Sequence, residues 1–173
     1  MSILKTGKIP LWTAFAFGMA LYLCSACSSR YQNDRFIFQV PAGTDLRKLR
    51  LDGEIKLWLN EGNIYFGVVQ SMIMAGSSLE EIFNNHRSEM EGRMHEYLFI
   101  SEARTEFRGV PAIETIYRGF NGAGYLLERE LWIEKDGWVY LLECSEAINF
   151  NQEIEVPISE VCYKLAEGFQ FKE

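Results

Sequence analysis

The sequence is poor in the residues on which most enzyme and metal sites depend. Its 173 residues include two histidines and four cysteines, and no G-x-S-x-G nucleophile motif occurs. Four prolines and 14 glycines are too few for a low-complexity linker protein. The longest predominantly apolar stretch, residues 9–23, has 15 residues, and a membrane-spanning helix needs ~20.

Basic residues are outnumbered by acidic ones. Lys and Arg total 17 against 24 Asp and Glu, which gives a formal charge of −7 and a pI of about 5.0. This balance argues against a nucleic-acid-binding protein, which needs a cationic face to displace counterions from phosphates. Hydrophobic residues at 48% and aromatic residues at 14% suffice for a substantial core. The length suits one domain and a short extra segment.

Residues 1–26 have the pattern of an export signal. Lys5 and Lys8 form a positive beginning, and no acidic residue occurs before Asp34. The apolar stretch at 9–23 has the length of the hydrophobic part of a signal peptide. The alternative interpretations are a plain secretory signal and an uncleaved membrane anchor.

Small residues Ser25 and Ala26 stand directly before Cys27. This arrangement resembles the lipobox of bacterial lipoproteins. The resemblance implies that the Cys27 thiol receives a diacylglycerol and that the chain is cut just before it. The competing Cys24 follows two bulky residues, so Cys27 is the better acceptor.

Cleavage before Cys27 would change the charge and leave the acyl chains as the membrane attachment. It removes Lys5 and Lys8 and no acid, so the formal charge goes from −7 to −9. Such a body does not bind an anionic membrane by charge. Residues 27–35 are then predicted as the lipidated cysteine and a short polar tether. We expect the protein in the cell envelope. Ser28 resembles the outer-membrane sorting pattern of Gram-negative lipoproteins, which in a Gram-negative host implies the periplasmic face of the outer membrane.

Cys144 and Cys162 are the two cysteines that remain, in a compartment that permits disulfides. Their spacing fits neither a zinc site nor a C-x-x-C redox pair. One interpretation is a bridge that closes a loop of about 18 residues and stabilises the fold by ~3 kcal/mol. The other is two buried thiols that act as small apolar groups.

Period-two and helical patterns predict a single α+β domain over residues 36–173. Strands are expected at 35–40, 54–59, 64–72, 97–107, 113–120, 125–134 and 138–144, and helices at 78–90 and from Pro157 onward. A capping box begins the first helix at Ser77 or Ser78. We expect one mostly antiparallel sheet of about six to seven strands, with both helices packed against one of its faces.

Five short motifs follow one another between residues 36 and 171. They are F-x-V-P-A-G at 38–43, S-L-E-E at 78–81, G-V-P-A at 109–112, G-W-V-Y at 137–140 and A-E-G-F at 166–169. This ordered set resembles the PsbP/Mog-like fold, and within it the bacterial DcrB-like lipoproteins. The resemblance implies a binding module, because relatives attach to a photosynthetic complex, a small GTPase, secreted effectors or envelope partners. It implies no shared catalytic residues.

One strand carries a candidate binding face. Glu128, Glu130 and Glu134 alternate along it, and Trp132 has the same parity. An aromatic side chain among charges is typical of a protein-binding surface, so we expect this face to be exposed. Arg104, Arg118 and Arg129 are expected to neutralise the glutamates across strands.

The two histidines are weak candidates for chemistry. His86 and His95 lie in or just after a charged helix, where a spacing with Glu89 or Glu91 that suits a metal arises easily by chance. We therefore expect a solvated helix face, with no metal and no cofactor. The prediction is a lipid-anchored, non-catalytic protein-binding or accessory module. Two alternatives stay open: a small-ligand binder or enzyme with a pocket between sheet and helices, and an immunity or inhibitor-type lipoprotein.

Overall fold

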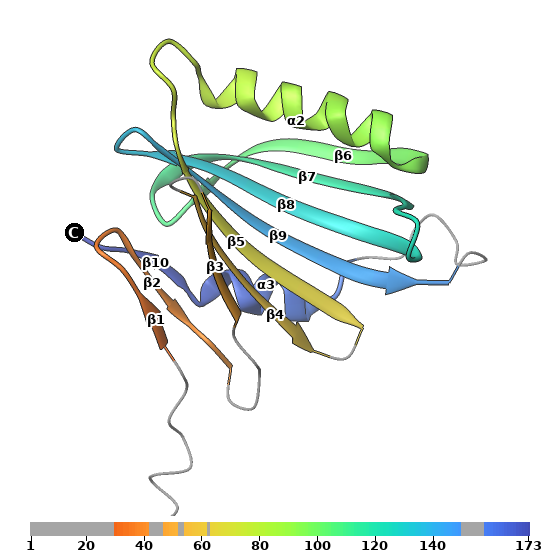
Figure 1. The fold of residues 1–173 in the computed structure, drawn as a ribbon, viewed down its shortest axis with the longest axis horizontal. Helices are drawn as coiled ribbons and strands as arrows, with labels where there is room; N and C mark the ends of the chain where they lie inside the picture. Colours follow the sequence, from red (N-terminus) through yellow and green to blue (C-terminus); the bar gives the residue numbers. More distant parts are fainter. Residues whose placement is uncertain (1–29, 42–46, 52–53, 62, 150–157) are drawn as a thin grey trace, which may run out of the picture.

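The computed structural model describes residues 30–41, 47–51, 54–61, 63–149 and 158–173 (Figure 1). These form ten strands in two antiparallel sheets, together with two helices. The predictions of a signal peptide and of lipid on Cys27 lie outside the described residues. None of the described helices is long and apolar enough to cross a membrane.

The larger sheet has seven strands in the order β3-β4-β5-β9-β8-β7-β6. Its strands are β3 Arg47–Leu51, β4 Glu54–Glu61, β5 Ile64–Met72, β6 His95–Phe107, β7 Val110–Phe120, β8 Tyr125–Lys135 and β9 Trp138–Ile148. The predicted hairpin over 54–72 and the antiparallel meander that follows the first helix are confirmed. Pairing of β5 with β9 joins these two units into one sheet.

The smaller sheet was not predicted. It consists of β1 Arg30–Gln32, β2 Phe36–Gln39 and β10 Phe169–Phe171, with β2 in the middle. The tether predicted over 27–35 is therefore wrong for its second half, and Phe169 lies in a strand rather than in the closing helix. Strands of three residues are too short for a periodic signal, and they form because they pair with β2. Phe36 and Phe169 stack 4.9 Å apart in the core, which fixes the C-terminal strand.

Local sequence explains where both helices begin. Helix α2 spans Leu79–Arg93, and the Ser78 side chain accepts a hydrogen bond from the Glu81 backbone N–H at 3.2 Å. The capping register is thus the one that begins at Ser78, and the helix continues three residues beyond the predicted end at 90. Helix α3 spans Glu160–Glu167 and is capped by Ser159.

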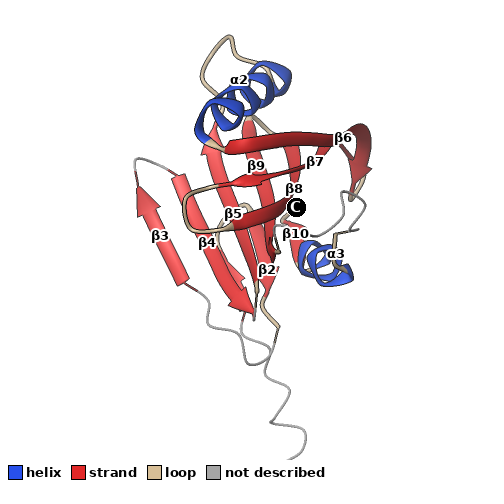
Figure 2. Ribbon diagram, turned by 90° about the vertical axis from the view of Figure 1, so that its right-hand side faces the viewer, coloured by secondary structure: helices blue, strands red, loops and turns tan. Residues whose placement is uncertain are grey.

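The two helices cover opposite faces of the larger sheet, with α2 on one side and α3 on the other (Figures 1 and 2). The expectation that both pack on one face is wrong. On the α3 side, Leu165 packs in a core with Phe66 and Leu142. On the α2 side, Phe83 packs with Trp132 and neighbouring aliphatic side chains. Strands buried on both faces read as nearly continuous apolar runs, and β9 begins with one.

A disulfide joins Cys144 of β9 to Cys162 of α3, across 18 residues of sequence. Cys144 does not end its strand, since β9 continues to Ile148. Both cysteines are fully buried in the α3-side core. The bridge therefore ties the short helix α3 to the centre of the larger sheet.

Removal of this bridge should destabilise the protein. We expect Cys144→Ser/Cys162→Ser to lower the free energy of unfolding by ~3 kcal/mol, because the unfolded chain regains the entropy of an open loop. Urea unfolding with and without a thiol reductant measures the difference. The reductant should destabilise the wild-type protein and leave the double variant unchanged. An equal response of both proteins would show that the bridge does not form.

Candidate functional site

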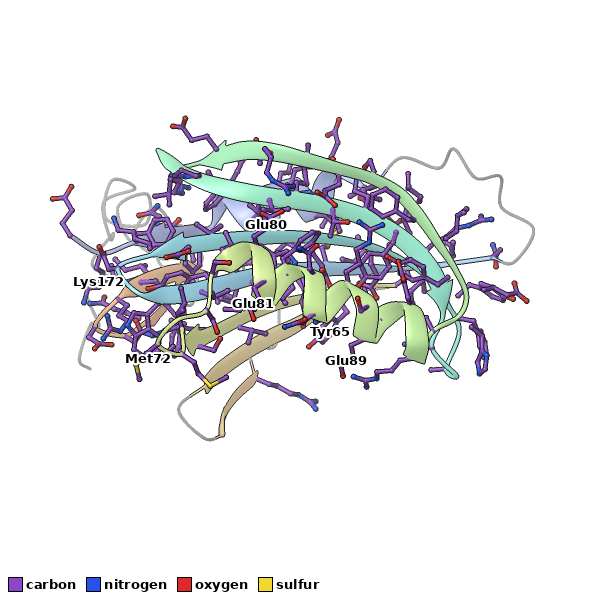
Figure 3. The ribbon with its side chains drawn as sticks, turned by 90° about the horizontal axis from the view of Figure 1, so that it is seen from above. Tyr65, Met72, Glu80, Glu81, Glu89 and Lys172 are labelled. Carbon is purple, nitrogen blue, oxygen red and sulfur yellow. A yellow bond between two sulfur atoms is a disulfide. The ribbon has the colours of Figure 1, made fainter. Side chains whose placement is uncertain are left out.

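The face predicted for partner binding lies beneath α2 (Figure 3). Glu128, Glu130 and Trp132 are only 8%, 3% and 4% exposed. The Trp132 ring packs edge-on against Phe83 of α2, with centroids 6.1 Å apart. Glu134, near the end of β8, is exposed. The prediction of an exposed binding face is thus wrong for the first three residues, because a second helix layer covers a surface that strand parity alone leaves open.

Glu130 is the centre of a buried hydrogen-bond network. Its Oε1 accepts a hydrogen bond from the Tyr117 hydroxyl at 2.7 Å and lies 2.9 Å from His86 Nε2. Its Oε2 accepts a hydrogen bond from the Trp132 indole N–H at 2.8 Å. Strand β7, helix α2 and strand β8 each contribute one partner. A carboxylate buried this deeply is stable only when it is bonded in this way.

His86 belongs to this network, so the prediction that it lies on a solvated helix face is wrong. Its ring is half-buried and lies 4.9 Å from that of Trp132. Burial lowers the pKa of His86, but the hydrogen bond and charge of Glu130 outweigh it, and the pKa is raised above the usual value. The contact between His86 Nε2 and Glu130 Oε1 joins α2 to the sheet, and it is an ion pair when His86 is protonated. His95 is exposed, as expected.

Two further glutamates face the same region. Glu143 lies opposite Glu130 in the β8–β9 register, and Glu128 lies opposite Ser145, whose hydroxyl donates a hydrogen bond to it. Gly67 of β5 makes room for Glu143, since a Cβ there would lie 2.3 Å from Glu143 Oε1. Backbone pairing thus brings three carboxyl groups together on adjacent strands.

This crowding changes the ionisation of Glu128 and of nearby tyrosines. Burial, with the charges of Glu143 and Glu130, raises the pKa of Glu128 to about 8, against the opposing effect of the Ser145 hydrogen bond. Glu128 therefore carries a proton at neutral pH. Burial and the neighbouring carboxylates also raise the pKa of Tyr65 to about 12 and that of Tyr117 further. We call Tyr65, His86, Tyr117, Glu128, Glu130, Trp132, Glu143 and Ser145 the acidic cluster.

Within the acidic cluster, Tyr117, Trp132 and His86 bond Glu130, and Ser145 bonds Glu128. In the described part of the chain, every buried side-chain nitrogen and oxygen has a hydrogen-bond partner. Among the same residues, no three His, Cys, Asp or Glu side chains are placed to hold a metal ion. The expected arginine pairs also form elsewhere: Arg129 pairs with Glu114 at 2.6 Å, and Arg104 pairs with Glu80 and Glu102.

The open surface lies instead along β6. Among the described strands it lies at one end of the sheet order and pairs only with β7. All seven residues 100–106 are exposed. Sequence analysis predicted the strand but missed its position at the edge. The signal was the run Ser101–Glu106, in which Glu102, Arg104 and Glu106 alternate with small residues rather than with core side chains.

The raised pKa of Glu128 predicts how stability depends on pH. The folded protein keeps a proton that the unfolded chain releases, so the associated stability is complete below the ordinary value of 4.5 and is lost as the pH rises through about 8. In Glu128→Gln the side chain is neutral at every pH. We expect the unfolding free energy of the wild-type protein to fall, relative to this variant, by up to ~1.4 kcal/mol per pH unit in that window.

Urea unfolding at several pH values between 4.5 and 8 measures this difference. Glu134→Gln is the matched control, because Glu134 is exposed on the same strand and should leave the pH dependence unchanged. Parallel curves for wild type and Glu128→Gln would show that Glu128 does not retain its proton on folding.

Comparisons with known proteins support the fold. No protein-family model and no curated protein sequence matches the chain. The solution structure of cyanobacterial PsbP (CyanoP) from Synechocystis sp. PCC 6803 matches with a TM-score of 0.59 and 14% identity, over 83% of this chain and 92% of that one. The crystal structure of PA94, a Pseudomonas aeruginosa protein of unknown function, matches with a TM-score of 0.51 and 12% identity, over 81% and 93%. This chain therefore has an α+β fold like that of PsbP.

Proposed function

We propose that this protein is a lipid-anchored component of the cell envelope that acts as a non-catalytic protein-binding or accessory module. The N-terminal sequence up to Cys27 supports the anchor, and the exposed edge of the larger sheet supports the binding role. The observation that carries the binding role is the exposure of residues 100–106 in an edge strand.

An edge strand of this length is a surface for adding a strand from another chain. No strand in the described part of the chain pairs with its outward backbone N–H and C=O groups, and extended segments bind such edges through main-chain hydrogen bonds. Glu102 and Arg104 pair with α2 through Arg87 and Glu80, so the charges of β6 lie toward the helix. Register irregularities are confined to the first part of the strand, between His95 and Ser101. The regular part, Ser101–Phe107, is the segment that suits a partner.

The acidic cluster supports a role without catalysis. A general acid or nucleophile must reach a substrate, whereas Glu130 already bonds Tyr117, Trp132 and His86. Glu128 is protonated but lies within the same covered layer. These groups act in this proposal as the polar contact between α2 and the sheet.

The anchor would hold the domain close to the membrane. Strand β1 begins at Arg30, so only Ser28 and Ser29 separate it from Cys27. Three residue steps span at most ~11 Å, because an extended chain advances 3.3–3.6 Å per residue. A partner of this domain would therefore lie at the membrane surface or be anchored there.

The anchor is tested by the intact mass of the protein purified from membranes of its native host. We expect a mass that lacks residues 1–26 and includes acyl chains, because the diacylglycerol is attached to the Cys27 thiol before cleavage. Cys27→Ala should abolish the modification, whereas Cys24→Ala is the matched control and should keep it. An unmodified chain that retains residues 1–26 would contradict the anchor.

The binding edge is tested by placing a photoreactive residue at Ala103 or Thr105 in the lipidated protein in its native host. We expect both positions to form the same crosslinked species, since both are exposed on β6. The control position is Asn85 on the solvent side of α2, which is also exposed and should not form it. Equal crosslinking from Asn85, or none from β6, would overturn the assignment of this edge.

A further inference from the structure

One end of the protein carries a basic hollow that the proposed binding role does not use. It lies where the β1–β2 turn and the β8–β9 turn meet the C-terminal strand β10, the end at which Figure 3 labels Lys172. Two adjoining cavities of about 150 and 280 Å³ share Lys135 and Phe171–Glu173 as walls. We call this site the basic hollow.

Four cations line the basic hollow: Arg35, Arg108, Lys135 and Lys172. Neutral groups hold them in place. Lys172 Nζ donates to the Asn33 carbonyl at 2.8 Å, and Arg108 Nε donates to the Phe169 carbonyl at 2.6 Å. Carbonyl oxygens fix these side chains without cancelling their charge.

Aromatic rings hold the other two cations. The Arg35 guanidinium lies 4.1 Å from the centre of the Trp138 ring, and Lys135 Nζ lies 5.0 Å from that of Phe171. Such contacts orient a cation and leave its other donors available. Phe171 also supplies an apolar wall to both cavities.

Three acidic side chains, Asp34, Asp136 and Glu173, line the hollow beside its four cations. These three are exposed, as is Arg108, whereas Arg35, Lys135 and Lys172 are partly buried. Among the described residues that line the hollow, one ion pair forms, from Arg35 Nε to Asp34 Oδ2 at 4.0 Å, and the Asp34 side chain is 80% exposed whereas that of Arg35 is 34% exposed. Water screens the exposed carboxylates more strongly than it screens the three partly buried cations.

Tight turns position two of the cations. Arg108 and Gly109 have φ angles of 51° and 77°, and Asp136 and Gly137, which follow Lys135, have 54° and 74°. Two successive positive φ angles are the geometry of the two-residue hairpin turn whose twist matches the strands. A side chain at positive φ costs ~1 kcal/mol, so Arg108 is an unusual choice at this position. Its hydrogen bonds to the Phe169 and Glu167 carbonyls hold it over β10.

We propose that the basic hollow binds the phosphate group of a small ligand. A single carboxylate would neutralise one of the four cations, whereas a phosphate monoester carries up to two charges and three acceptor oxygens that suit guanidinium and ammonium donors together. The surrounding protein is strongly acidic, so a cationic hollow at one end attracts an anion only locally.

The phosphate can belong to a soluble metabolite or to a lipid headgroup. The site stands independently of the β6 binding edge.

The test is calorimetric titration of the full chain, purified in a neutral detergent at low salt. Two probes separate the sources: phenyl phosphate, a monoester with a ring for Phe171, and glycerophosphoglycerol, a soluble diester with the headgroup of phosphatidylglycerol. We expect at least one probe to bind, and binding to weaken as salt is added. Binding of the monoester alone indicates a soluble ligand, and binding of the diester indicates a lipid headgroup.

The variant that tests the site is Lys135→Gln/Lys172→Gln. It should raise the Kd of the bound probe at least ~10-fold, because each charge-assisted hydrogen bond contributes more than 1 kcal/mol. Lys135→Gln alone should raise Kd by a smaller factor. This variant removes only the contact between Lys135 and the Phe171 ring, so we expect the protein to fold normally. Lys164→Gln is the matched control, because Lys164 is exposed on α3 away from the hollow's lining, and it should leave Kd unchanged. No binding of either probe, or an unchanged Kd in both hollow variants, would overturn the proposal.

Discussion

Strands β8 and β9 are buried on both faces, and the rest of the protein is arranged around that burial. From Leu127 to Ile133 every residue of β8 is buried, whichever face its side chain points to. A sheet with two buried faces needs a covering layer on each side. Helix α3 and the small sheet cover one face, and helix α2 covers the other. The disulfide of Cys144 and Cys162 holds the first layer in place.

The two layers are held by different chemistry. The α3 side is apolar, and aromatic rings from β2 and β10 complete its core. The α2 side is apolar around Phe83 and Trp132 and becomes polar around Glu130. Glutamates can be buried there because Tyr117 and His86 bond Glu130 and because Glu128 keeps its proton. The packing of helix α2 on the sheet is consequently the part of the structure whose stability we expect to depend on pH.

The surfaces that are left to interact lie away from these layers. The β6 edge offers backbone groups to another strand, and the basic hollow offers cations to a phosphate. They lie in different places and suit different chemistry, so one protein could hold a partner and a ligand at once.

Strands β2 and β4 to β9, the first helix and the antiparallel hairpins were predicted, because each depends on periodicity, a turn or a cap within a few residues. Helix α2 begins at Ser78 for such a local reason. Strand β3, Arg47–Leu51, was not predicted. The short strands β1 and β10 were not predictable, since three residues carry no periodic signal and form only through pairing with β2.

The candidate site was the part on which sequence reasoning was wrong. Strand parity placed Glu128, Glu130 and Trp132 correctly on one face, and it could not say what covers that face. His86 is 44 residues away from Glu130 in sequence, and only the docking of α2 brings them within 2.9 Å. The sequence by itself determined the α+β class, the hairpins and the chemistry available on each strand, because these follow from neighbours along the chain. Tertiary structure alone decided which glutamates are buried, which strand is the edge and which cations converge, because contacts between distant segments set the burial and the local charge.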